Sequence, residues 1–256
     1  MSSLEKLDLS LVVSVKQRFI DGNELKFNIL NHLPLLKKFL FNIRSLINFV
    51  HQTNFTTNEE IQRTLKDFPS EQIFSSLDHF PQNGFSQCRI YSCPYQLDYY
   101  YNLTNRFPGG FFPCVHDVTL LDEQPFEHAF FLRIAQSFPF LEILTVINRK
   151  RQNERRLPNT RDWKKSFSVI EYPYLHRLDL MEAHQDYHEQ FLFDTKSTFP
   201  NGLYVTMDYQ FARKVTRNFR RNSTRSNCAK ISFVSFYRKL PYPAHMKDYF
   251  PSADIP

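Results

Sequence analysis

The chain has 256 residues, of which 42% are hydrophobic and 16% aromatic, and this apolar content excludes a disordered protein. The formal net charge is +6, the N-terminal "MSSLEKLDLSL" is too acidic for a secretory signal, and no apolar run approaches the roughly 18 residues of a membrane-spanning helix. We therefore expect a cytoplasmic or nuclear protein that has no membrane partner.

The cysteine and glycine residues argue against a metal-binding protein and against a nucleotide-binding enzyme. The four cysteines show no CxxC pairing, so we expect buried, reduced thiols rather than metal ligands. The five glycines cannot be assembled into GxGxxG or GxxxxGKS/T, the loops that hold phosphates in dinucleotide-binding and nucleoside-triphosphate-binding enzymes. We expect no cofactor.

From the N-terminus onward, one short pattern recurs, reading apolar–Pro–x–apolar–x–x–apolar–x–apolar. Its full copies are "LPLLKKFLFNI", "FPFLEILTVIN" and "YPYLHRLDLME". Full and partial copies together lie at 4–11, 33–43, 85–92, 115–122, 138–148, 172–182 and 199–209. Alternating apolar residues predict a short strand with one face in a core, and the proline predicts the end of a preceding helix.

Amphipathic segments separate these strands and predict helices. Residues 23–33 carry an apolar stripe, and residues 125–138 open with a proline suited to a first helical turn. A third helix is predicted over 184–196. A run dense in strand formers, "KISFVSFY" at 230–237, is the last predicted strand.

This order of strand, helix, proline and strand predicts an α/β fold of the leucine-rich-repeat type. We expect residues 1–256 to form a single irregular domain, a solenoid (horseshoe) with parallel strands on the concave face and helices on the convex face. The copies are less regularly spaced than the roughly 20–29 residues of strict repeats, so insertions are expected, including a basic loop at about 149–170. Six positions should be buried: Leu141, Leu144, Val146, Leu175, Leu178 and Leu180.

The pattern resembles the irregular leucine-rich-repeat region of F-box proteins, the substrate receptors of cullin–RING ubiquitin ligases. More narrowly, "PFEHAFFLRIAQSFPFLEILTV" and the segment from Asp186 to Ile231 resemble the C-terminal half of a large invertebrate family of F-box-domain proteins, over about 85–256. The resemblance implies a protein-binding scaffold that recognises a substrate. No helical segment with a Leu-Pro-x-Glu-like start precedes the first predicted strand, so we expect this chain to lack the F-box itself. A ligase adaptor is expected as a partner only if an F-box lies upstream.

Two histidines four residues apart, His184 and His188, would share one face of the predicted helix. A zinc site needs three or four ligands, and Glu189 would point about 100° away from His188. We therefore predict no metal site. We expect both histidines to face outward, while Tyr187 and Phe191 face the sheet.

Adjacent acid–base residues, His116 with Asp117 and Glu127 with His128, could suggest catalysis. Neighbours in sequence rarely face each other, and no serine or cysteine nucleophile is placed beside them. We predict that the protein is not an enzyme.

Positive charge is concentrated in the second half of the chain. Residues 1–148 contain 12 Lys/Arg and 15 Asp/Glu, whereas residues 149–256 contain 20 and 11. The cluster at 149–165 resembles a nuclear-localisation patch, although a solvated inserted loop explains it equally simply. The cluster from Arg213 to Lys230 has seven basic residues and no acid, and supports an alternative function, nucleic-acid binding by the basic C-terminal half.

The preferred function is binding of a protein partner on the concave face. Residues between the inward-facing anchors of a strand point to the opposite face. The predicted partner-binding residues are Arg89, Tyr91, Thr119, Leu121, Thr145, Ile147, Arg177, Asp179, Met181, Thr206 and Asp208. Among them, apolar residues that the fold does not bury would contribute most to binding.

Overall fold

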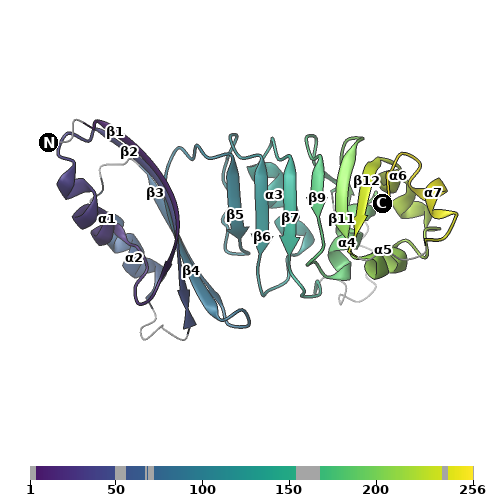
Figure 1. The fold of residues 1–256 in the computed structure, drawn as a ribbon, viewed down its shortest axis with the longest axis horizontal. Helices are drawn as coiled ribbons and strands as arrows, with labels where there is room; N and C mark the ends of the chain where they lie inside the picture. The colour runs from purple at the N-terminus through teal and green to yellow at the C-terminus, as the bar shows by residue number, and fades with distance from the viewer. Residues whose placement is uncertain are drawn as a thin grey trace. The chain divides into compact units, whose positions relative to one another are not determined.

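A computed structural model describes residues 4–49, 56–66, 68, 72–153, 168–237 and 242–255. The chain divides into two compact units, Met1–Gln96 and Leu97–Pro256, where the sequence analysis expected one domain. Each unit has its own sheet (Figure 1). Among the described residues, no helix combines the length and the apolar character that crossing a membrane requires.

The first unit contains a four-stranded mixed sheet and, among its described residues, two α-helices. The strands lie in the order β1-β2-β4-β3. β1 is parallel to β2, whereas β4 is antiparallel to both β2 and β3. The elements are β1 (Lys6–Val15), α1 (Gly22–Asn28), η1 (Leu30–His32), β2 (Lys38–Asn48), α2 (Asn58–Leu65), β3 (Ile73–Phe80) and β4 (Phe85–Ser92).

Local signals explain where the helices of this unit begin. The Asp21 side chain accepts a hydrogen bond from the backbone N–H of Glu24 and caps α1. Thr57 and Glu60 form a capping box at the start of α2. Apolar residues of both helices, among them Leu25 and Ile61, join the core of the sheet.

The repeat prediction is only half right in this unit. The copies at 4–11 and 33–43 do form parallel neighbours, because Lys6 pairs with Lys38 and Val15 with Ile47. The copy at 85–92 runs the opposite way, because it is the return strand of a hairpin with β3. Asn83 and Gly84 lie in the hairpin turn, and Gly84 has φ of 73°, a conformation that favours glycine.

The second unit contains a six-stranded parallel sheet, in the order β12-β11-β9-β7-β6-β5. The order of the strands across this sheet is therefore the same as their order along the chain, read from β5 to β12. The sheet strands are β5 (Tyr99–Leu103), β6 (Asp117–Leu121), β7 (Ile143–Ile147), β9 (Arg177–Asp179), β11 (Leu203–Met207) and β12 (Ile231–Phe236).

Helices and a two-stranded ladder connect these strands. Figure 1 shows α3 and α4 behind the sheet of this unit. The remaining elements are α3 (His128–Ser137), β8 (Ile170–Glu171), α4 (Gln185–Leu192), β10 (Ser197–Thr198), α5 (Tyr209–Val215), α6 (Asn222–Ala229) and α7 (Met246–Tyr249). β8 pairs in parallel with β10. Strand, helix and strand thus alternate as predicted from β6 to β7 and from β9 through β11 to β12, whereas no helix is described between β5 and β6 or between β7 and β9.

The core of the second unit confirms the predicted anchors. All six predicted core residues are buried, with exposures of 2% for Leu141 and 0% for the other five. Successive anchors stack across the sheet, because Val118 pairs with Leu144, Leu144 with Leu178, and Leu178 with Val205. Phe131 of α3 contacts Tyr187 and Phe191 of α4 through ring edges, so the helices close the same core.

Predicted boundaries hold to within a few residues. The helix predicted over 125–138 is α3, the one over 184–196 is α4, and the last strand over 230–237 is β12. The helix predicted over 23–33 ends at Asn28 and continues as a short 3-10 turn. Of the predicted basic loop at about 149–170, residues 154–167 lie outside the described part of the chain.

Candidate functional site

The open face of the six-stranded sheet is the first candidate site. Along each strand, residues between the buried anchors are half-buried or exposed, as expected for a sheet face without a covering layer. The parallel register aligns these side chains across strands. One row is Thr119, Thr145, Asp179 and Thr206, and beside it Leu121 pairs with Ile147.

Nine of the predicted site residues belong to this part of the chain. Eight are half-buried and Arg177 is exposed. Met181 follows β9, and its backbone N–H donates to the carboxylate of Asp179 at 2.9 Å. Asp208 follows β11 and caps α5 by accepting from the N–H of Phe211. The structure thus places Thr119, Leu121, Thr145, Ile147, Arg177, Asp179, Met181, Thr206 and Asp208 on β6, β7, β9 and β11 or directly after them.

A hydrogen-bonded pair of polar side chains lies on this face where β5 meets β6. The hydroxyl of Tyr101 donates to the carboxylate of Asp117 at 3.0 Å. Burial, with the nearby Asp98, raises the pKa of Asp117, whereas the Tyr101 hydrogen bond and the charge of Arg177 act to lower it. Among the described strand residues, this face therefore has two acidic side chains, Asp117 and Asp179, and one cationic side chain, Arg177.

Aromatic side chains lie on the strands toward both ends of the sheet. Tyr99 and Tyr101 of β5 stack with ring centroids 4.7 Å apart. Tyr204 of β11 stacks on Phe233 of β12 at 5.2 Å, and 52% of the surface of Tyr204 is exposed. These rings were not among the predicted site residues, although they occupy the same alternating positions of their strands.

The prediction was wrong for Arg89 and Tyr91. Both lie on β4 of the first unit, outside the parallel sheet, and both are buried. Arg89 donates to the side-chain oxygen of Asn42 at 3.4 Å, and the ring of Tyr91 stacks on Phe74. They are buried residues of a mixed sheet, in a strand that runs antiparallel to both its neighbours because the hairpin turn at Asn83 and Gly84 reverses the chain.

The histidine pair is also arranged differently from the prediction. His184 is the N-cap of α4, and its Nδ1 accepts from the N–H of Asp186 at 3.2 Å. His188 is fully buried, beside the ring of Phe211, so the expected outward orientation is wrong. Burial lowers the pKa of His188 to about 4. Its imidazole is therefore neutral at pH 7, and its Nε2 has no hydrogen-bond partner within the described residues.

The histidines of the two sequence-adjacent acid–base pairs contact side chains from other parts of the chain. His116 contacts Glu142 at 3.1 Å, and His128 contacts the side chain of Gln190 at 3.1 Å. Over the described part of the chain, no three His, Cys, Asp or Glu side chains are arranged to hold a metal ion.

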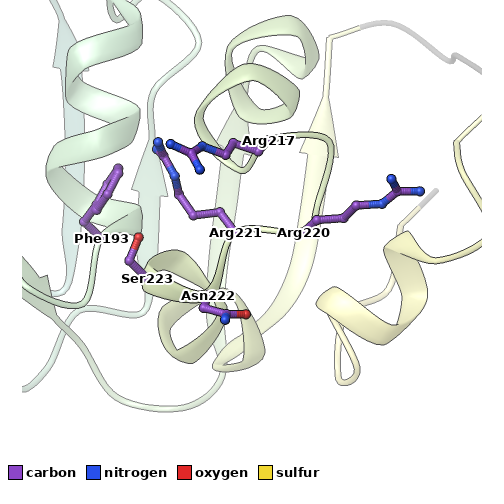
Figure 2. Close-up of a pocket in the computed structure, with 6 residues that line it drawn as sticks. All are labelled: Phe193, Arg217, Arg220, Arg221, Asn222 and Ser223. Carbon is purple, nitrogen blue, oxygen red and sulfur yellow. The ribbon is translucent and has the colours of Figure 1, made fainter.

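A basic pocket of about 480 Å³ is the second candidate site (Figure 2). It is lined by Phe193, Arg217, Arg220, Arg221, Asn222 and Ser223, which lie around the connection between α5 and α6. The sequence indicated the charge of this region but not the pocket. Three successive residues of the connection have positive φ angles, namely Arg217, Asn218 and Phe219. None of them is a glycine, so the sequence does not indicate this backbone conformation.

Within the pocket, Arg221 is held by two contacts. Its guanidinium donates to the carbonyl of Val215 at 2.8 Å and lies 4.8 Å from the ring centroid of Phe193. Burial and the neighbouring charge of Arg217 lower the pKa of Arg221. Figure 2 shows Arg217 and Arg221 extending toward one another, whereas Arg220 extends to the other side.

Comparison with known proteins adds no neighbour to these observations. No family model matches the chain, and no curated protein and no solved structure is significantly similar to it.

Proposed function

We propose that the second unit is a leucine-rich-repeat-like solenoid whose open sheet face binds a protein partner. The observation that carries this proposal is the register of half-buried and exposed side chains over β6, β7, β9 and β11, opposite anchors that are fully buried. A parallel sheet that leaves one face without a helical layer is unusual outside repeat proteins. The open face would then be the functional surface, as in the substrate-recognition region of an F-box-type ubiquitin-ligase receptor.

The chemistry of the face favours a protein over a nucleic acid. Short threonine side chains lie beside Leu121 and Ile147, and the exposed ring of Tyr204 adds an aromatic contact. Such mixed apolar, aromatic and hydrogen-bonding surfaces are typical of protein interfaces. The carboxylates of Asp117 and Asp179 would repel a phosphate backbone.

The alternative, nucleic-acid binding by the basic C-terminal half, has less support. Stacking on single strands requires accessible rings. In "DYQFARKVTRNFRR" the rings of Tyr209 and Phe219 are buried, at 8% and 2% exposure, and Phe211 is half-buried against His188. A fluorescence titration with single-stranded RNA of random sequence tests this alternative, and we expect no binding at about 150 mM salt.

The protein-binding proposal is tested with a photo-crosslinking amino acid at Thr145, in the middle of the face. The matched control position is Gln136, which is exposed on α3. We expect one partner to cross-link from Thr145 and not from Gln136. The purified partner should bind at least about tenfold more weakly to Leu121→Asp, Ile147→Asp and Met181→Asp, because a charge would be buried in the interface.

The melting temperature of each aspartate variant decides how the result is interpreted. We expect it to stay close to that of the parent, because the three side chains are half-buried on an open face. Variants that unfold would place these residues in the core and refute the proposal. Variants that fold and still capture the partner would place binding elsewhere on the chain.

A further inference from the structure

The basic pocket between α5 and α6 concentrates positive charge without an acidic counterpart. Arg217, Arg220 and Arg221 form no ion pair within the described residues. Asp194 is close by, since its backbone N–H donates to the carbonyl of Ser223 at 3.1 Å, yet its carboxylate pairs with none of these arginines in the described part of the chain. The mutual repulsion that lowers the pKa of Arg221 would be relieved by a bound anion.

The arginine geometry suits an oxyanion with several acceptors. Arg217 and Arg221 extend toward one another (Figure 2), and Ser223, which has a hydroxyl group, also lines the pocket. Planar guanidinium groups bind phosphate through paired hydrogen bonds. Arg221 is already positioned by Val215 and Phe193, so it loses little conformational freedom on binding.

The start of α6 adds backbone donors to the same pocket. The N-cap residue Arg221 provides no side-chain cap, so the N–H groups of Asn222 and Ser223 have no partner among the described residues. Unpaired first-turn N–H groups and the helix dipole both stabilise a negative charge. They reinforce a site that the arginines and the cavity already define.

We propose that this pocket binds the phosphate monoester group of an organic ligand. A volume of about 480 Å³ exceeds what a bare anion fills, so the phosphate would be carried on a larger group that occupies the remaining space. The donors converge on one cavity instead of following an extended strip, which favours a single terminal phosphate over the repeated diesters of a nucleic acid. A phosphorylated protein side chain and a small sugar phosphate offer the same group.

The test is calorimetric titration of the full chain with three probes. They are a phosphoserine peptide with its unphosphorylated form, glucose 6-phosphate, and inorganic phosphate. We expect binding of at least one organic phosphate, no binding of the unphosphorylated peptide, and weaker binding of inorganic phosphate. A preference for the phosphopeptide identifies a protein side chain as the source, and a preference for glucose 6-phosphate identifies a small metabolite.

Matched variants separate the pocket from general attraction to a basic surface. Arg217→Gln removes one of the two converging guanidinium groups and should weaken binding by about tenfold or more. Arg221→Lys keeps the charge but loses the paired hydrogen-bond geometry, and it should also weaken binding. Lys214→Gln removes the same charge from an exposed residue of α5 outside the pocket and should change affinity by less than about twofold.

Three outcomes would overturn the proposal. The first is that no organic phosphate binds at concentrations up to about 10 mM. The second is that Lys214→Gln weakens binding as much as Arg217→Gln does, with all variants folded by circular dichroism. The third is that single-stranded RNA binds more tightly than any monoester probe and depends equally on Lys214 and Arg217, which would assign the region to a diffuse nucleic-acid surface.

Discussion

The two units use the same alternation of apolar residues in sheets of different kinds. In the second unit, β6, β7, β9 and β11 are parallel neighbours, and one face of each strand stays open. In the first unit, the last two strands form a hairpin, and side chains on both faces of β4 are buried. A period of two therefore identifies a strand with a buried face, but what packs against the other face decides whether that face remains available to a partner.

The largest expected effect tests whether the two cores are separate. Leu178→Ala removes a side chain with 0% exposure from the second unit, and Ile43→Ala removes one with 1% exposure from the first. Each should cost about 2–5 kcal/mol of unfolding free energy, because each leaves a cavity. Hydrogen exchange resolved by peptide should detect the loss mainly in the unit that carries the substitution. Equal loss of protection in both units from either substitution would contradict the division.

The next largest expected effect is a pH dependence of the stability of the second unit, which contains His188. Burial lowers the pKa of His188 from 6.5 to about 4, so the unfolded chain binds a proton more readily than the folded one. Stability should therefore fall as the pH drops from about 6.5 to about 4, by about 3 kcal/mol in total. Urea unfolding at pH 7 and pH 4 measures the change.

Two histidine variants sharpen this test. His188→Gln should flatten the pH dependence of the second unit, whatever its effect on stability at pH 7. His116→Gln is the control, since His116 is only half-buried in the same unit. An unchanged pH dependence in His188→Gln would show that another group causes it.

The smallest effect compares one turn in each unit. Gly84 has φ of 73° and Gly202 has φ of 91°, and an added Cβ would meet no atom within 4 Å at either position. Gly84→Ala and Gly202→Ala should each cost about 1–2 kcal/mol, because the left-handed conformation disfavours a side chain even where there is space. Thermal unfolding measures both. A loss below about 0.3 kcal/mol would mean that the turn relaxes to another conformation.

Much of the second unit could be predicted from residues that act locally. The copies at 138–148 and 172–182 contain a proline before the strand and alternating apolar residues within or next to it, and both became strands of the parallel sheet with one buried face. The hairpin of the first unit was missed, although Asn83 and Gly84 between two apolar runs are a recognised turn signal. The segment 85–92 matches the repeat only in part, and the turn that precedes it is the stronger local signal.

The candidate sites were less predictable than the core. The open-face residues of β6, β7, β9 and β11 follow from alternation once the core face is known. The pocket does not, because Arg217 and Arg221 are brought together by three non-glycine residues in the left-handed region. Burial of His188 depends on the position of Phe211, which a helical wheel of α4 alone cannot supply.

By itself, the sequence determined which residues of the second unit alternate into a core, where three of the helices lie to within a few residues, and that positive charge accumulates after residue 148. These properties depend on neighbours within a few positions along the chain. Only the tertiary structure decided that β4 runs against β2, that His188 is buried and that two arginines share a pocket. Each of these features depends on which distant segments of the chain pack together. That packing requires long loops to close around a common core, so it cannot be derived from neighbouring residues.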